Sequence, residues 1–167
     1  MAKERKKLKK TSSKPSAPAE RESGKTSIGS DTVLVVDTNE FIFGLTGTKQ
    51  SCVTLLDNFG ELTVIIPAMV LREIRLHLDT RYQLGKKFFR LITSGKNITI
   101  LWGDPPQELI EKHISLGFAE EDAMIAAAAE WAGADFIISE NRHFLQRKKG
   151  TTFQTINAEK ALTLLKL

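Results

Sequence analysis

Residues 33–39 read Val33-Leu34-Val35-Val36-Asp37-Thr38-Asn39. The four apolar residues lack polar alternation, which is typical of a strand buried on both faces inside a parallel sheet. Sheets of this kind bind ligands at the carboxyl ends of their strands. We therefore expect Asp37 to present its carboxylate at that edge, with Thr38 or Asn39 capping a short helix that follows.

The rest of the chain alternates apolar runs with segments of helical periodicity. Strands are expected over residues 62–66, 97–101, 136–138 and 153–156. Helices are expected over residues 40–45, 50–59, 68–79, 81–93, 104–116, 120–133, 142–148 and 158–167. This alternation predicts an α/β fold with a mostly parallel sheet of about five strands and helices on both faces.

Charge divides the chain into two parts. Residues 1–30 hold nine Lys/Arg and three Glu, whereas residues 31–167 hold fifteen Lys/Arg and seventeen acidic residues. With almost no apolar content, residues 1–30 are predicted to be a disordered basic tail, and residues 31–167 to form the folded domain. The basic cluster at residues 3–10 has two interpretations, a phosphate-binding segment or a solvated tail that aids solubility.

Composition and motifs exclude several classes of protein. The single cysteine, Cys52, rules out an internal disulfide and a cysteine-only metal cluster, and it is expected in the core. No apolar run is long enough to cross a bilayer, and no apolar segment follows the basic N-terminus as in a secretory signal. We expect a cytoplasmic protein that binds no membrane. The glycine patterns of dinucleotide-binding, phosphate-loop and serine-hydrolase sites are also absent.

Acidic side chains recur where the predicted strands end. The residues concerned are Asp37 after the first strand, Glu73 in the helix after the second, Asp122 at the start of the alanine-rich helix, and Glu140 with Asn141 after the fourth. Carboxylates pointed at one spot repel one another, and a divalent cation relieves that repulsion. Oxygen ligands without His or Cys suit Mg²⁺ or Mn²⁺.

Each of these residues also has an ordinary structural interpretation. Asp37 can be a strand-end cap, Glu73 a surface charge, and Asp122 an acid that the helix dipole favours. Glu140 and Asn141 can be turn residues. Two histidines, His113 and His143, have no His or Cys partner at metal-ligand spacing and are expected on the surface.

Four segments together resemble the PIN-domain family of metal-dependent ribonucleases. They are residues 35–39, 67–74, 121–128 and 136–144, which occur in the order of the family. The resemblance covers about residues 32–160. It implies a PIN-like three-layer α/β/α sandwich with a single acidic groove.

The resemblance also implies a chemistry for the acids. Asp37, Glu73 and Asp122 would bind Mg²⁺ or Mn²⁺ in an endoribonuclease, with Thr38, Asn39 and Ser139 supporting the site or the attacking water. Basic residues should flank such a groove and bind RNA phosphates. The first candidates are Arg72, Arg75 and Arg142, and the wider set adds Arg81, Lys86, Lys87, Arg147, Lys148 and Lys149. Many members of the family are VapC-like toxins that an antitoxin protein blocks, and many form homodimers.

The chain departs from the family pattern at one position. Where the family often has Thr-x-Asp after the fourth strand, this chain has Ser139-Glu140-Asn141. Either Asn141 ligates a metal or positions water through its carbonyl, or Glu140 supplies the charge from the next position. The alternative function is a weakly active or inactive PIN-like module that binds RNA or a protein partner. A haloacid-dehalogenase-type phosphatase is disfavoured, because Asn39 stands where a second Asp is needed. A receiver domain is disfavoured because it needs paired acids at the end of the first strand and an Asp closing the third strand, which here ends Ile100-Leu101-Trp102.

Overall fold

The structure is a computed structural model that describes residues 27–146 and 149–166. Five strands form one sheet in the order β3-β2-β1-β4-β5, and every neighbouring pair is parallel. The strands are β1 (Val33–Val36), β2 (Thr63–Pro67), β3 (Ile98–Leu101), β4 (Phe136–Ile138) and β5 (Gln154–Ile156). The predicted α/β fold with a five-stranded parallel sheet is confirmed.

Helices occupy most of the remaining described residues. They are α1 (Thr38–Thr46), α2 (Gln50–Asp57), α3 (Ala68–Leu78), α4 (Tyr82–Ser94), α5 (Gln107–Ser115), α6 (Glu120–Trp131), α7 (Arg142–Leu145) and α8 (Ala158–Leu165), with a 3₁₀ turn at Phe59–Glu61. The helix predicted from residue 104 begins three residues later. Pro105 and Pro106 precede it, and Pro106 is its N-cap.

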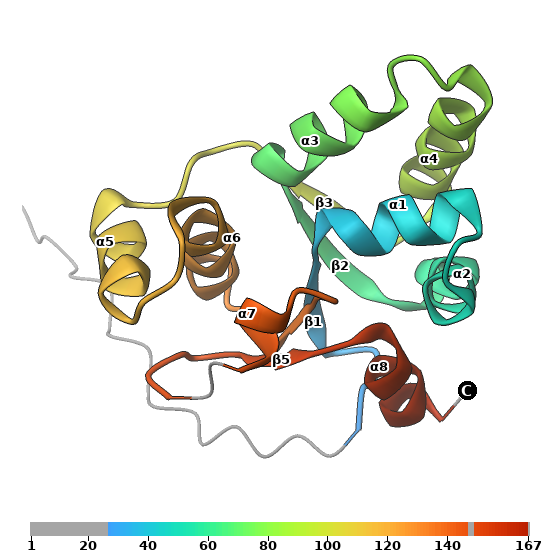
Figure 1. Cartoon of the computed structure of the whole chain (residues 1–167). Coiled ribbons are helices and arrows are strands. Elements are labelled where there is room, and N and C mark those ends of the chain that lie inside the picture. The colour runs from blue at the N-terminus through green and yellow to red at the C-terminus, as the bar shows by residue number, and fades with distance from the viewer. Residues whose placement is uncertain (1–26, 147–148, 167) are drawn as a thin grey trace, which may run out of the picture.

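The helices cover both sides of the sheet. Figure 1 shows α5 and α6 on one side and α1 with α2 on the other. The α3–α4 hairpin rises from the end of β2 and packs against α1. In α6, a run of fully buried alanines brings the helix close to the sheet, because these side chains are the smallest that still favour a helix.

Strand β1 lies at the centre of the sheet and determines where a ligand can bind. The chain builds β2 and β3 on one side of β1, and then β4 and β5 on the other. The order therefore reverses between β1 and β4, which is the switch point where parallel sheets open a crevice. Val36 pairs with Ile138 in register. The polar residues that follow these two strands thus emerge side by side.

The folded part begins earlier than the predicted boundary at residue 31. Ile28 is buried, and its backbone N–H donates to the carbonyl of Leu164 at 3.1 Å. The expectation of disorder is therefore wrong for residues 27–30, while the basic cluster at residues 3–10 lies outside the described residues. Cys52 is buried in the core as predicted. Within the described part of the chain, no helix is both long and apolar enough to cross a membrane.

Candidate active site

Asp37 leaves the buried strand β1 directly at the switch point. Its side chain caps α1, since Oδ1 accepts the backbone N–H of Thr38 at 2.7 Å. The other oxygen, Oδ2, accepts the hydroxyl of Ser139 at 2.8 Å. The predicted cap at Thr38 or Asn39 is therefore wrong, because the acid itself serves that role. Two uncharged donors, one from each side of the switch point, hold the carboxylate in place.

The environment of Asp37 disfavours its charge. Burial raises the pKa of Asp37 most, the hydrogen bonds from Ser139 and Thr38 lower it, and the negative charges of Glu73 and Asp122 raise it again. The net effect is a raised pKa. Glu73 and Asp122 thus lie close enough to Asp37 to disfavour its ionisation, and a bound cation would relieve this repulsion.

Glu73 reaches the same edge from α3. The hydroxyl of Thr38 donates to Oε2 of Glu73 at 2.6 Å, so one threonine connects the first acid to the second. Thr38 is buried, whereas Glu73 is exposed on the solvent side of the edge. The next residue of α1, Asn39, is exposed, and its side chain forms no hydrogen bond within the described residues.

Asp122 and Asn141 meet on the other side of Asp37. Both oxygens of Asp122 lie near the amide nitrogen of Asn141, at 3.2 and 3.4 Å. The Asn141 carbonyl accepts the backbone N–H of His143 at 2.9 Å and caps α7, which fixes the orientation of the amide. Asn141 therefore offers Asp122 a hydrogen-bond donor, while its carbonyl is already used as a cap.

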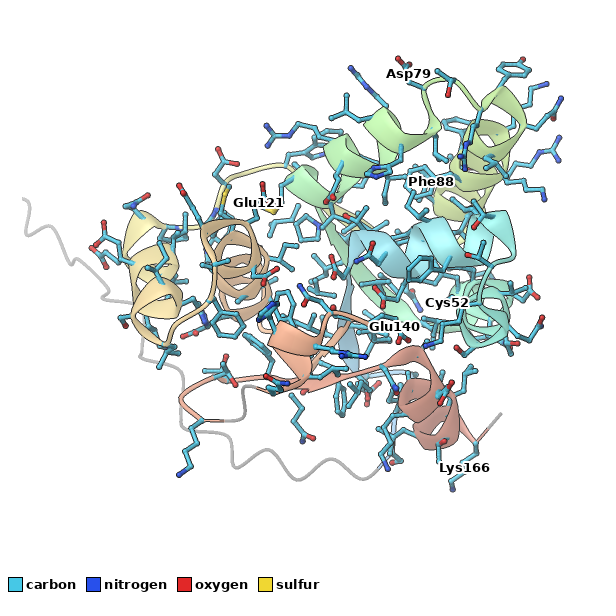
Figure 2. The ribbon with its side chains drawn as sticks, in the orientation of Figure 1. Cys52, Asp79, Phe88, Glu121, Glu140 and Lys166 are labelled. Carbon is cyan, nitrogen blue, oxygen red and sulfur yellow. The ribbon has the colours of Figure 1, made fainter. Side chains whose placement is uncertain are left out.

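Glu140 does not join these acids. Its Oε2 forms an ion pair with Lys49 at 2.5 Å, and Oε1 accepts the backbone N–H of Ala158 at 3.3 Å. Figure 2 shows Glu140 on the side of Cys52 and α2, away from Glu121 at the start of α6. The interpretation in which Glu140 replaces the missing fourth acid is therefore not supported by its position.

Comparison with known proteins places this geometry in a wider context. No protein-family model and no curated protein matches the sequence. Several solved structures are similar in fold, among them the following two. VapBC2 from Rickettsia felis, bound to a DNA fragment from its promoter, is 17% identical with a TM-score of 0.53, over 75% of this chain and 98% of that one. PAE2754 from Pyrobaculum aerophilum is also 17% identical with a TM-score of 0.54, over 89% and 95%.

VapC is a PIN-domain toxin. This chain has a PIN-like fold. The resemblance noted in four sequence segments is thus confirmed at the level of the fold, and identities of 17% extend it no further.

The donors at the PIN-like edge suit a hard divalent cation. Asp37, Glu73 and Asp122 supply only oxygen ligands, from three different elements, as Mg²⁺ and Mn²⁺ prefer. Over residues 27–146 and 149–166, no group of three or more His, Cys, Asp or Glu side chains has metal-ligand spacing. The three acids fit the metal in their donor chemistry alone, and they would have to move closer together to hold it.

A further acid, Glu40, lies beneath this edge and was not predicted. It is fully buried in the first turn of α1, and neither carboxylate oxygen has a hydrogen-bond partner among the described residues. Burial, followed by the charge of Asp37, raises the pKa of Glu40 to about 9. The charge of Glu140 contributes to the rise, and a backbone interaction with Glu140 opposes it. The spacing Asp37-x-x-Glu40 places Glu40 one helical turn from the site, but spacing alone does not reveal burial.

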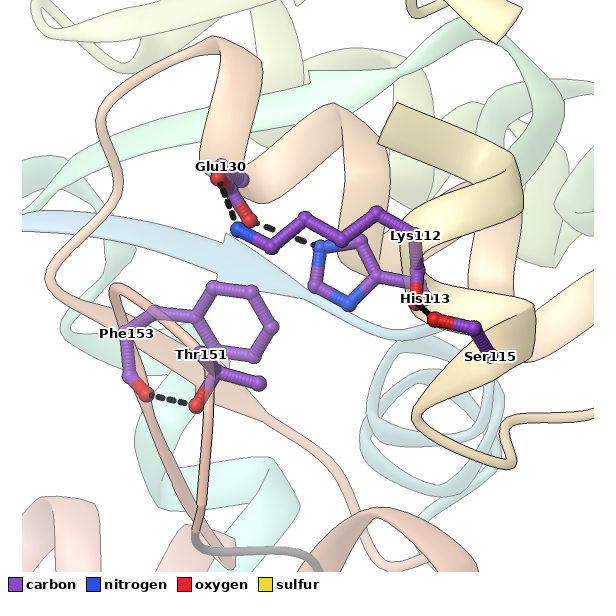
Figure 3. Close-up of polar contacts among 6 residues, drawn as sticks. All are labelled: Lys112, His113, Ser115, Glu130, Thr151 and Phe153. Carbon is purple, nitrogen blue, oxygen red and sulfur yellow. Dashed lines mark hydrogen bonds and ion pairs between the residues drawn. The ribbon is translucent and has the colours of Figure 1, made fainter. Parts of the chain in front are cut away.

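A cluster of one acid and two basic side chains joins α5 to α6, on one side of the sheet. Glu130 accepts from Lys112 at 2.6 Å and from Nε2 of His113 at 2.9 Å, as Figure 3 shows. His113 is fully buried and stacks on Phe153, so its predicted surface position is wrong. Burial lowers the pKa of His113, against the opposing effect of Glu130. This cluster fastens two helices together and has no part in the site.

The predicted phosphate-binding residues are on the surface. Arg72, Arg75 and Arg142 are all exposed. Arg72 lies next to Glu73 in α3 and approaches Asp104 at 3.5 Å, in an ion pair whose two side chains are mostly exposed. Arg142 begins α7, immediately after Asn141. Of the wider set, Arg147 and Lys148 lie outside the described residues.

Proposed function

We propose that this chain is an Mg²⁺- or Mn²⁺-dependent endoribonuclease, with Asp37, Glu73 and Asp122 as its metal-binding acids. One observation carries the proposal. Three acids from distant parts of the sequence lie at the same edge of the sheet, around the β1–β4 switch point, where Glu73 and Asp122 raise the pKa of Asp37. Natural proteins retain such repulsion at functional sites, because a bound ligand relieves it.

The residues of the chain would prepare this site before RNA arrives. Ser139 and the backbone of Thr38 fix the Asp37 carboxylate, and the Thr38 hydroxyl orients Glu73. Asn141 holds Asp122 through its amide. When bound, Mg²⁺ or Mn²⁺ would supply Lewis-acid polarisation of the phosphodiester and would lower the pKa of the attacking water. The exposed Arg72, Arg75 and Arg142 would bind the flanking phosphates.

The test is cleavage of a mixed pool of structured and single-stranded RNA, with Mg²⁺ or Mn²⁺ compared with EDTA. Asp37→Asn and Asp122→Asn remove one charge each at nearly constant volume. Glu140→Gln is the matched control, because it removes a charge at the same sheet edge from a residue outside the site. We expect metal-dependent cuts that disappear in the first two variants and persist in the control. Cuts that persist in all three would contradict the proposal.

One observation favours a second candidate function, a weakly active module that binds RNA or a protein. Asn141 stands where PIN-domain nucleases often have an acid. Its amide nitrogen donates to Asp122, and its carbonyl oxygen accepts the backbone N–H of His143 at the start of α7. If the wild-type chain retains RNA in the presence of Mg²⁺ and Mn²⁺ but cuts none of it, this second function replaces the first.

The fold similarity also suggests a biological setting. We propose that the nuclease acts in the cytoplasm as a VapC-like toxin, forms a homodimer, and is blocked by a small antitoxin protein. The support is the likeness to VapBC2 of Rickettsia felis. Expression of this chain should then stop growth, and co-expression of a small neighbouring gene should restore it. Growth that continues while active nuclease accumulates would exclude the toxin role and leave the chemistry intact.

A further inference from the structure

Helix α4 exposes two aromatic side chains that its packing does not require. Tyr82 is 70% exposed and Phe89 is 64% exposed. The opposite side of the helix already anchors it, because Phe88 is buried and meets the ring of Phe41 edge-on at 5.6 Å between centroids. Figure 2 shows Phe88 between α4 and α1. The exposed rings therefore remain available for a partner.

These rings share one face of the helix with positive charge. Tyr82, Lys86 and Phe89 follow the i, i+4, i+7 spacing of a single helical face, and Arg90 borders it. The ammonium of Lys86 lies 4.5 Å from the centre of the Tyr82 ring. Helix α4 contains three basic residues and no acid. We call this surface, formed by Tyr82, Lys86, Phe89 and Arg90, the α4 face.

The charge around the α4 face differs from that of the rest of the domain. Residues 71–96 hold seven Lys/Arg and two acidic residues, whereas the remainder of 31–167 holds eight Lys/Arg and fifteen acidic residues. The basic segment is thus net +5 in a domain that is otherwise net −7. A partner for this face should be anionic and should also present flat apolar surfaces.

The α4 face is continuous in the chain with the candidate active site. Helix α3 starts at the carboxyl end of β2 and carries Glu73 into the site. From there it runs to Asp79, which Figure 2 shows at the tip of the hairpin, and α4 returns from that tip. Arg72 and Arg75 of α3 are exposed, so basic side chains lie on the helix that connects the site to α4.

We propose that the α4 face is a stacking platform for a single-stranded arm of the RNA substrate. Unpaired bases would stack on Tyr82 and Phe89, while Lys86 and Arg90 would contact the phosphates between them. The two rings are seven residues apart, about 10 Å along the helix axis, a gap that one flexible strand can bridge. Duplex RNA hides its base faces and would not use the platform. This inference rests on the proposed ribonuclease function.

Binding of a fluorescent oligouridine to the full-length protein in EDTA tests the platform without cleavage. Tyr82→Ala and Phe89→Ala should each weaken binding about 5- to 100-fold, the range expected for losing one stacked base. Tyr82→Phe should bind like the wild type, because it keeps the ring. Ile114→Ala is the control, since it removes an exposed apolar side chain from α5. Duplex RNA should bind equally well to all four variants.

Salt dependence separates the two kinds of contact. Arg90→Ala should reduce the slope of log affinity against log salt by about 0.7, as expected for one lost phosphate contact to a single strand. The aromatic variants should leave that slope unchanged, because stacking releases no counterions. Lys87 points away from the α4 face by its helical position, so Lys87→Ala is the charge-matched control with the smaller expected change.

The outcomes distinguish this inference from the proposed function. Wild-type cleavage together with unchanged RNA binding in Tyr82→Ala and Phe89→Ala would overturn the platform alone. Aromatic-dependent RNA binding with no cleavage by the wild type would uphold the platform and overturn the nuclease. Sedimentation provides the last test, because a change of oligomeric mass in the two variants without a change in RNA affinity would assign the α4 face to a protein interface instead.

Discussion

Glu130 and Asp37 show two opposite ways of placing a carboxylate in this domain. Glu130 has an ammonium and an imidazole at its two oxygens, and together they join α5 to α6. Asp37 has a hydroxyl and a backbone amide, forms no ion pair with any other described residue, and lies near two further acids. The first arrangement satisfies its charge and stabilises packing. The second leaves the charge of Asp37 without a positive partner among the described residues, which is what the proposed cation site requires.

This comparison predicts that activity and stability respond in opposite directions at Asp37. Asp37→Asn should reduce cleavage by at least about 100-fold, since it removes a metal-binding charge. The free energy of unfolding in EDTA should stay equal or rise by about 1 kcal/mol, because the variant ends repulsion and keeps a good helix cap. Cleavage assays and urea denaturation of the same preparation measure both. A large loss of stability would mean that Asp37 is a structural acid like Glu130.

Glu130→Ala should have the largest effect on stability. It leaves His113 buried without a partner on Nε2, and Nδ1 already has none among the described residues. The expected loss is about 2 to 4 kcal/mol of unfolding free energy. Cleavage per folded molecule should not change. Because burial lowers the pKa of His113, stability in the wild type should also fall as pH drops below the ordinary histidine pKa, through the lower folded value.

The sequence is sufficient to predict the position of Asp37 at the sheet edge, but it is insufficient to predict the partners of Glu130. An unbroken apolar strand that ends in an acid implies a buried strand and a carboxylate at its edge, whatever its neighbours are. The role of Glu130 depends on α5, whose polar surroundings at Glu111, Lys112 and His113 suggested a surface helix. Only the pairing of α5 with α6 in space buries the imidazole and gives the acid its two partners.

The three residues after β4 also depend on partners that the local sequence does not reveal. Ser139, Glu140 and Asn141 are adjacent, so sequence places all three near the site. Their side chains separate because Lys49 at the start of α2 attracts Glu140, and because α7 needs the Asn141 carbonyl as its cap. Both causes lie outside the motif. The sequence pattern therefore cannot predict the directions of these three side chains at the carboxyl end of β4.

Glu40 is a third kind of acid, buried with no basic partner among the described residues. Its pKa of about 9 means that it folds as the neutral acid and ionises on unfolding at neutral pH. Its contribution to stability is therefore fully present below about pH 4.5 and is lost progressively as the pH rises to about 9. Glu40→Gln should raise the unfolding free energy by about 1 to 3 kcal/mol at pH 8 and change it little at pH 5. A gain of equal size at both values would show that charge is not the cause.

Asn141→Asp should make the stability of the protein more dependent on bound metal. The aspartate keeps the cap of α7, but it replaces the donor to Asp122 with a like charge. In EDTA, stability should fall by about 0.5 to 1 kcal/mol, and the stabilisation by added Mg²⁺ should exceed that of the wild type. Thermal unfolding with and without Mg²⁺ measures the difference. An equal metal-induced shift in both proteins would mean that residue 141 does not face the cation.

Glu140→Gln should have the smallest effect on the unfolding free energy. It tests whether Glu140 is a structural acid like Glu130 or a functional acid like Asp37. Its ion pair with Lys49 is partly exposed, so its loss should lower the unfolding free energy by less than about 1 kcal/mol. A double-mutant cycle with Lys49→Gln isolates the pair, and metal-dependent cleavage should remain unchanged. If the variant cleaves poorly and the cycle shows no coupling energy with Lys49, Glu140 is a functional acid of the site. The acids that follow β4 would then contribute to function as well as to stability.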